Sequence, residues 1–344
     1  MSRLTDTLAP AWQKLQAAIA NRSADGAATQ APARAGVPTS LDDTCDMNEQ
    51  AGDRIASTKS SLGSLARLFR PWSSGRQRLT RMYDMLASCT PTPPPYEFQH
   101  LARWAKTIEH LEPLARPGER WLDVASDPWC AGITSAELAR VGPVDLIPTG
   151  FMREEFTLEF GAGRTYRYQP AELLITKGML DFNLGNDFDL VMSLEMIEHL
   201  KFHPAGFLAG MNNALRPGGS LVITTPNVAS WATIDRILEG ATPHLTPQYG
   251  GDAHHRKEYT VWEMSQLVEA AGFKVAKVTT FDCYASDYRT LPRKLHYAGT
   301  LAWQGATLQA KRVRNMLLQF GSTMLIHAVK TGPCDVERVA RIAV

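Results

Sequence analysis

The sequence has few cysteines and no paired arrangement of them. Its five cysteines stand far apart in 344 residues, at positions 45, 89, 130, 283 and 334, and none belongs to a Cys-x-x-Cys pair. Zinc knuckles and disulfide-stapled secreted domains both need closely spaced cysteines. The cysteine pattern therefore predicts neither of them, and it favours a reducing, cytoplasmic compartment.

Long apolar runs and an excess of charge of one sign are also missing. No run approaches the roughly 18 to 20 apolar residues that a membrane span requires, and the first residues lack the apolar core of a secretory signal. The formal net charge is only +1. Because no basic field covers the whole chain, we expect no nucleic-acid partner. The hydrophobic content of 44% allows a sizeable core.

The most informative stretch of the chain is 188–227. Residues 188–193 are short, apolar and rich in β-formers, which predicts a strand buried on both faces. Pro204 suits the first position of a helix, apolar residues then recur at helical spacing, and Pro217-Gly218-Gly219 ends the helix. Residues 221–225 form a second β-rich run. Strand, helix, turn and strand make one βαβ unit with parallel strands, which indicates an α/β fold.

This stretch resembles the second half of the class I S-adenosylmethionine (SAM) methyltransferases of the small-molecule type. The family pattern has the parts fDlV, E-x-x-EH-h and L-x-PGG-x-h-h-h-x-x-PN. Residues 188–191, 195–200 and 215–227 match these parts in the same order. The resemblance covers residues 96 to 331, and it implies a doubly wound, mostly parallel seven-stranded sheet, a Rossmann-like methyltransferase fold with SAM as the cofactor. Residues 321–329 resemble the family's last strand, which pairs antiparallel at the sheet edge.

The cofactor half departs from the family pattern because it lacks glycine. In the family the first strand leads into a loop of the form LDxGxGxG, whereas Leu122-Asp123-Val124 is followed here by Ala125-Ser126-Asp127-Pro128-Trp129. Proline fixes φ and tryptophan is bulky, so we expect a loop of different shape. Residues 147–149 occupy the end of the next strand, where the family has an acid for the ribose hydroxyls, and none of them is acidic.

The resemblance nevertheless implies cofactor-binding residues at the ends of several strands. The residues at the matching positions are Asp123, Ala125, Ser126, Asp181, Phe182, Ser193, Leu194 and Glu195. Asp181 takes the place of an acid that can accept a hydrogen bond from the adenine amino group. The alternative for Asp181 is an ordinary loop residue that caps a turn.

Two histidines are the predicted catalytic residues. His199 follows Glu195 and Glu198 at the i, i+3, i+4 spacing of one helical face. This trio resembles one that can hold a divalent ion in ubiquinone-type O-methyltransferases, but Glu198 and His199 can also brace the turn, and we predict no metal site. His255 lies in a segment that resembles the family's H-x-R-E-Y-T. An imidazole titrates near neutral pH, which suits a general base, although a histidine in a loop can also serve only as a hydrogen-bonding group.

Composition divides the chain into four parts. We predict a flexible tail over 1–60, a basic helical segment and proline-rich linker over 61–95, a methyltransferase-like domain over 96–331 and a C-terminal tail over 332–344. Between Arg54 and Arg81 seven positive residues and no acidic one alternate with apolar residues. This pattern suits an anionic membrane surface or a protein partner, and the alternative is a solvated segment at the domain edge.

Together these features predict a SAM-dependent methyltransferase that acts on a hydroxyl oxygen of a small molecule or glycan. Such a reaction needs the acceptor, the methyl carbon and the sulfur in line, and a general base contributes a further ~10²- to 10⁴-fold. The alternative is a methyltransferase-like binding or scaffold subunit without catalysis, which the glycine-poor loop favours. A nicotinamide-dependent oxidoreductase is disfavoured, because no G-x-G-x-x-G follows a strand.

Overall fold

The computed structural model describes residues 73–150, 155–161, 163–172, 174–176, 179–181, 184–240, 255–283 and 320–342. The stretch 1–60, expected as a tail, lies outside these residues, as do residues 61–72 of the expected basic segment. Among the described residues, no helix combines the length and the apolar character that crossing a bilayer requires.

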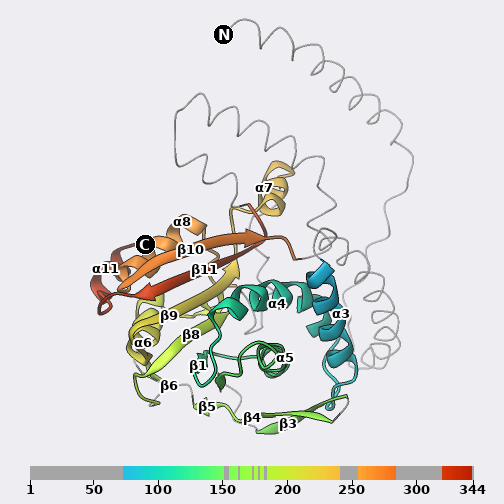
Figure 1. Ribbon diagram of the computed structural model, residues 1–344. Helices are drawn as coiled ribbons and strands as arrows, with labels where there is room; N and C mark the ends of the chain where they lie inside the picture. Colours follow the sequence, from blue (N-terminus) through green and yellow to red (C-terminus); the bar gives the residue numbers. More distant parts are fainter. Residues whose placement is uncertain are drawn as a thin grey trace, which may run out of the picture. The chain divides into compact units, whose positions relative to one another are not determined.

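A seven-stranded sheet forms the centre of the described part (Figure 1). Its strands, in spatial order, are β10 (Phe273–Phe281), β11 (Thr323–Lys330), β9 (Leu215–Pro226), β8 (Phe188–Leu194), β1 (Arg120–Asp123), β2 (Asp145–Gly150) and β5 (Ala171–Glu172). The pairs from β9 to β5 are parallel, and β11 is antiparallel to both of its neighbours. The predicted doubly wound, mostly parallel seven-stranded sheet is therefore confirmed. The expected position of the last strand was wrong, because β11 lies between β9 and β10, and β10 forms the edge.

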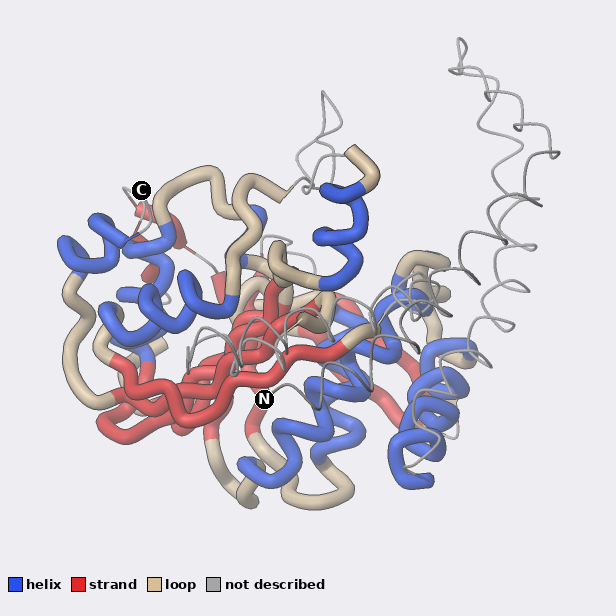
Figure 2. The backbone as a smooth tube through the Cα atoms, turned by 90° about the horizontal axis from the view of Figure 1, so that it is seen from above, coloured by secondary structure: helices blue, strands red, loops and turns tan. Residues whose placement is uncertain are grey.

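Helices cover both faces of this sheet (Figure 2). The helices α6 (Pro204–Ala214), α8 (Val261–Ala270) and α11 (Val336–Ile342) pack on one face, and α3 (Ser73–Ala87), α4 (Glu97–Leu111) and α5 (Pro128–Leu138) belong to the other side. Short helices η3 (Glu112–Leu114) and η4 (Ile197–His199) follow α4 and β8, and α7 (Trp231–Leu238) follows β9. Two hairpins, β3 (Phe156–Phe160) with β4 (Arg164–Tyr168) and β6 (Leu174–Thr176) with β7 (Met179–Asp181), stand outside the main sheet.

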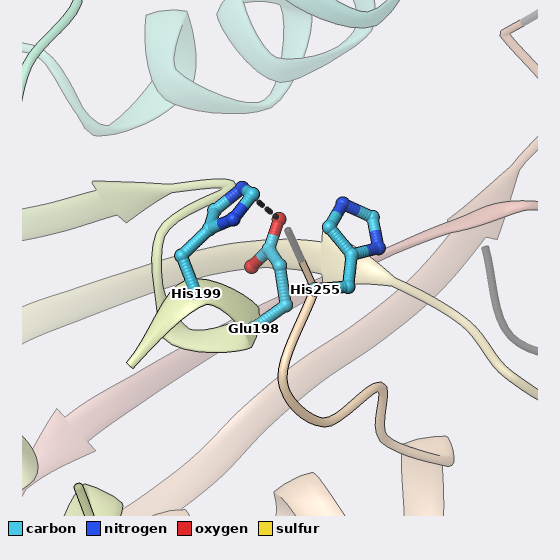
Figure 3. A group of neighbouring side chains, drawn as sticks. All are labelled: Glu198, His199 and His255. Carbon is cyan, nitrogen blue, oxygen red and sulfur yellow. Dashed lines mark ion pairs between the residues drawn. The ribbon is translucent and has the colours of Figure 1, made fainter. Parts of the chain in front are cut away.

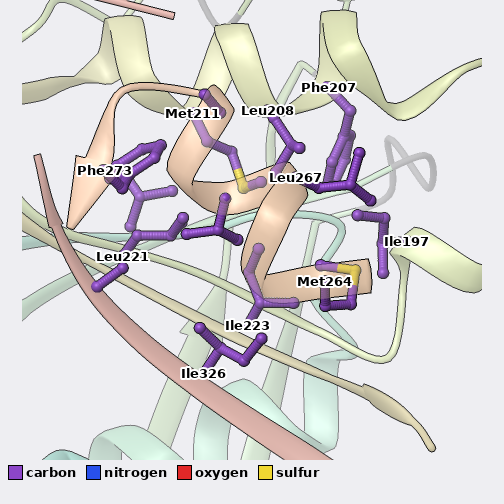
Figure 4. Close-up of a cluster of buried hydrophobic side chains, with 14 of the residues drawn as sticks. Ile197, Phe207, Leu208, Met211, Leu221, Ile223, Met264, Leu267, Phe273 and Ile326 are labelled. Carbon is purple, nitrogen blue, oxygen red and sulfur yellow. The ribbon is translucent and has the colours of Figure 1, made fainter. Parts of the chain in front are cut away.

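Local sequence signals explain where the helices on the first face begin. Pro204 occupies the first turn of α6, and Thr260 and Glu263 form a reciprocal capping box at the start of α8. Met264 and Leu267 of α8 then pack with α6 and the sheet in the largest apolar cluster (Figure 4). Each such fully buried side chain contributes about 1.5–3 kcal/mol. This cluster fixes β8 and β9, whose ends carry the predicted site.

The described end of the basic segment is bound inside the protein. Arg78 of α3 pairs with Glu112, and Arg81 pairs with Glu137, whose carboxylate lies 2.7 Å from the Arg81 Nη2. The apolar face of α3 packs on α4 and α5 in a second apolar cluster. These two arginines therefore hold α3 against the fold. The predicted outside contact of residues 54–81 and the cytoplasmic location stay predictions.

The stretch 332–344, expected as a tail, contains α11. Val339 of this helix is fully buried in the same cluster as α6 and α8. Lys330, just before it, donates hydrogen bonds of 2.7 Å to the carbonyls of Asn212 and Leu215. The end of the described chain is thus packed on α6 and α8.

Candidate functional site

The carboxyl ends of β1, β8 and β9 meet at one edge of the sheet. Asp123, the last residue of β1, lies beside Met192 of β8, and Leu194, the last residue of β8, lies beside Thr224 of β9. In a doubly wound sheet the ligand lies outside the carboxyl ends of the strands. Most of the predicted site residues are therefore gathered where a ligand is expected.

The loop after β1 keeps a glycine-like backbone without glycine. Ala125 has φ 58°, in the left-handed region, which costs a non-glycine residue about 1–2 kcal/mol. The Ala125 amide donates to the Thr149 hydroxyl at 3.1 Å, and the Ser126 amide donates to the Thr149 carbonyl at 2.7 Å. These bonds to the end of β2 hold the strained residue in place. Ala125, at the position of the family's first glycine, thus adopts a backbone conformation that favours glycine.

The bulky residues of the loop start the next helix. Asp127 caps α5 by accepting a hydrogen bond of 2.8 Å from the Cys130 amide, and Pro128 takes the first helical position. Trp129 packs with the apolar cluster of α3 and α4, and its indole is close to the Cys89 thiol. Its ring is therefore part of the helical layer beside the sheet.

Asp123 is the buried acid of this loop. Its side chain accepts a hydrogen bond of 2.7 Å from the Ser126 hydroxyl, and the residue is 2% exposed. Burial raises the pKa of the Asp123 carboxyl to about 7, the Ser126 hydrogen bond opposes this shift, and the charge of Asp127 adds to it. A cationic ligand beside Asp123 would stabilise the charged carboxylate.

Glu195 is held at the end of β8 by an arginine that the sequence did not single out. Arg103 of α4 places its Nη1 3.1 Å from the Glu195 Oε2, and both side chains are largely buried. The other oxygen, Oε1, is buried without a hydrogen-bond partner among the described residues, and so is the Ser193 Oγ. Arg103 was missed because one arginine on an amphipathic helix matches no motif. Only the packing of α4 over the strand ends brings it to the site.

Three further side chains converge beyond β8 and β9 (Figure 3). Glu198, His199 and His255 each offer a ligand atom, and these atoms lie within 4.8 Å of one another. The two imidazole rings meet edge to face with their centroids 4.9 Å apart, and the His199 Nε2 is 3.9 Å from the Glu198 Oε1. Thr225 donates to the Glu198 Oε2 at 2.9 Å. Complete burial, together with the charge of Glu195, raises the Glu198 pKa well above its usual range. The two predicted catalytic histidines are thus brought together.

His255 is oriented by a residue that the sequence reasoning missed. Glu258 places its Oε1 2.6 Å from the His255 Nδ1, and the Glu258 residue is only 8% exposed. The amides of Arg256 and Lys257 donate to the Glu198 carbonyl, which docks this loop on η4. The spacing of three residues between His255 and Glu258 was a usable signal, because it lets the two side chains meet within one turn.

The remaining predicted cofactor residues are less informative. Leu194 is partly buried and packs against the clusters on the α4 side of the sheet. Asp181 ends β7, in the separate hairpin with β6, opposite Leu174. Phe182 lies outside the described residues. The adenine-side role of Asp181 and Phe182 therefore stays a prediction.

Comparison with known proteins identifies the family of this chain. Residues 96–278 match the family described as methyltransferase domain. The chain is 29% identical over 185 residues to the ubiquinone biosynthesis O-methyltransferase of Parvibaculum lavamentivorans, and the match covers 52% of this chain and 66% of that protein. It is 30% identical over 164 residues to the protein of the same name from Aeromonas salmonicida, covering 46% of this chain and 64% of that protein. The match thus spans slightly less than two thirds of each relative.

A solved SAM-dependent methyltransferase from Archaeoglobus fulgidus is 16% identical with a TM-score of 0.39, covering 68% of this chain and 99% of that one. The family match over more than half of the sequence shows that this chain belongs to the class I SAM-dependent methyltransferases. Its cofactor is S-adenosylmethionine. The Ser193 Oγ and the Glu195 Oε1 have no partner among the described residues, and together with the buried Asp123 carboxyl they fit a polar, cationic ligand at these strand ends.

Proposed function

We propose that the protein transfers a methyl group from SAM to a hydroxyl oxygen of a small molecule or glycan. The observation that carries this proposal is the Glu258–His255 pair, which lies beside His199 at the edge of the sheet where the cofactor is expected. The two relatives are both named O-methyltransferases, which supports oxygen as the acceptor atom. All of the residues that carry the proposal lie in the proposed domain of residues 96–331.

The residues of this chain position the acceptor and remove its proton. The hydrogen bond to Glu258 occupies the His255 Nδ1, which leaves Nε2 as the atom that takes the hydroxyl proton. The cofactor supplies a methyl group on a positively charged sulfur. When bound, it would give this methyl group to the acceptor oxygen, and its sulfur would keep the electron pair of the broken carbon–sulfur bond. His199 contacts the His255 ring edge to face and so lies directly beside the proposed base.

A metal-assisted form of the same reaction is the second candidate. Glu198, His199 and His255 provide one carboxylate and two imidazoles within reach of one divalent ion. The ion would polarise the acceptor hydroxyl. The test is activity after chelation and dialysis, followed by addition of Mg²⁺, Mn²⁺ or Zn²⁺. Full activity in the presence of chelator would contradict this form and leave the metal-free base mechanism.

The experiment for the main proposal measures S-adenosylhomocysteine formed from SAM. The purified protein is supplied with a panel of polyhydroxylated phenols and short glycans, and product mass is checked for a gain of one methyl group. We expect turnover with at least one acceptor. A chain that binds S-adenosylhomocysteine but methylates no acceptor of either class would support the alternative of a binding or scaffold subunit and contradict the enzymatic proposal.

A further inference from the structure

The hairpin of β3 and β4 carries a buried hydroxyl next to the loop that follows β1. Tyr166 of β4 has its ring in the apolar cluster of α3, α4 and α5, and its hydroxyl oxygen is buried without a hydrogen-bond partner among the described residues. Burial and the nearby Asp123 carboxyl raise the pKa of this hydroxyl. The hydroxyl of Tyr166 is therefore close to the acid of the cofactor loop. Native proteins rarely leave such a group unpaired, and a ligand is one reason for it.

The hairpin is firmly attached to the loop and to α5. The Tyr168 hydroxyl, two residues further along β4, donates to the Ser126 carbonyl at 3.0 Å. Phe160 of β3 packs so closely on α5 that a Cβ at Gly132 would lie 2.8 Å from its Cζ. Main-chain bonds of 2.8 and 2.9 Å also join Glu159 to Thr90. The position of Tyr166 is thus fixed by contacts on several sides.

The end of β2 lacks the acidic side chain that would bind the ribose of a nucleoside. In a doubly wound fold an acid at this place accepts a hydrogen bond from the ribose. Here the strand ends with Pro148, Thr149 and Gly150. The Thr149 hydroxyl already donates to the Asp123 carbonyl at 3.2 Å and accepts from the Ala125 amide at 3.1 Å. The strand end therefore has no carboxylate, and its one hydroxyl is already used by the loop.

Tyr166 can fill this gap, because its hairpin is bonded through the Tyr168 hydroxyl to Ser126 of the loop after β1. We propose that the Tyr166 hydroxyl binds a ribose hydroxyl of the cofactor, in place of the missing acid at the end of β2. Tyr168 then acts as the positioning residue, since its bond to the Ser126 carbonyl fixes the hairpin over the loop. This inference rests on cofactor binding by the wild-type chain, and its test measures binding directly.

The test is calorimetric titration of the full chain with S-adenosylhomocysteine. We expect Tyr166→Phe to weaken binding about 5- to 10-fold, the range for loss of one hydrogen bond. Tyr83→Phe is the matched control, because Tyr83 lies in the same apolar cluster but on α3. That variant should bind like the wild type. Thermal unfolding without ligand should be similar for both variants, which separates a binding role from a structural one.

Deoxy analogues of the ligand identify the group that Tyr166 binds. The wild type should bind either the 2′-deoxy or the 3′-deoxy analogue more weakly than S-adenosylhomocysteine, and Tyr166→Phe should have lost that preference. Wild-type affinity in Tyr166→Phe, or an unchanged preference between the analogues, would overturn the inference alone. Absence of binding by the wild-type chain would instead overturn cofactor binding, and the proposed function with it.

Discussion

Ala125 and Glu195 both adopt a left-handed backbone, with φ of 58° and 56°, at the ends of two adjacent parallel strands. Each residue turns the chain directly into the site, and each is stabilised from outside its own loop. Thr149 binds the Ala125 amide, and Thr224 accepts a hydrogen bond of 2.9 Å from the Glu195 amide. Strain of this kind persists only where surrounding contacts enforce it. Hydrogen bonds to the adjacent strands therefore hold both residues in this conformation, although neither residue is a glycine.

The first prediction concerns this strain. Ala125→Gly should raise the free energy of unfolding by about 1 kcal/mol, because glycine adopts positive φ without steric cost. Chemical denaturation measures the difference. Ala131→Gly is the control, since Ala131 is a buried residue inside α5 and the same change there should destabilise by about 0.5–1 kcal/mol. Equal destabilisation by both changes would show that Ala125 is unstrained in solution.

The base proposed for the reaction gives the second prediction. His255→Asn should lower kcat about 10²- to 10⁴-fold, because the general base is lost. Glu258→Gln should lower it less, since the imidazole remains but loses its carboxylate partner. Steady-state rates with SAM and the identified acceptor provide the measurement, and Glu269→Gln on the exposed side of α8 is the control. A His255→Asn enzyme with wild-type kcat would remove His255 from the mechanism.

A third prediction tests the ion pair between α4 and β8. Arg103→Gln should destabilise the protein by about 2–4 kcal/mol, because it leaves the largely buried Glu195 carboxylate without its cation. Adding Glu195→Gln should recover part of the loss. The pair Arg167–Glu155 is well exposed, so Arg167→Gln should change stability by less than about 1 kcal/mol. Similar denaturation midpoints for the two arginine variants would contradict the structural role of Arg103.

The pH dependence of stability provides the fourth prediction. The pKa of Asp123 is about 7 in the folded chain, against about 3.9 when unfolded. Between these values the folded state holds the extra proton, so the contribution of Asp123 to stability falls as pH rises from 4 to 7. Asp123→Asn has no proton to lose. Its stability relative to wild type should therefore increase by about 2–3 kcal/mol between pH 5 and pH 8. A difference that does not vary with pH would mean that the pKa of Asp123 is not raised.

The fifth prediction addresses the contact between α5 and the β3–β4 hairpin. Gly132→Ala should destabilise by about 1–3 kcal/mol, because the new methyl group would overlap the buried Phe160 ring. Gly332→Ala is the control, since nothing lies within 4 Å of a Cβ built there. The two melting temperatures give the comparison. Equal melting temperatures would show that the Phe160 ring moves away from α5 in solution without a measurable loss of stability.

Much of the sheet was predictable from local patterns. The strand expected over 188–193 is β8, and the helix after Pro204 is α6, because apolar periodicity and end signals act within a few residues. The role of α3 was not predictable in this way. The proline-rich stretch before α4 indicated a linker, yet α3 on its far side packs on α4 and α5. At the site, His199 and His255 were found by motif. Arg103 was not, because it reaches the end of β8 only through the packing of α4. Tyr166, which we propose to bind the ribose, matched no motif either.

The place of β11 between β9 and β10 determines when the sheet can be completed. β9 ends at Pro226 and β10 begins at Phe273, yet each pairs with β11, which begins only at Thr323. During synthesis on the ribosome, β10 therefore emerges before β11, the one strand with which it pairs among the described residues. Pairings between distant parts of a chain form slowly. β11 thus joins β10 to β9, and a nascent chain that stalls before Thr323 would expose the open edges of both strands to neighbouring chains.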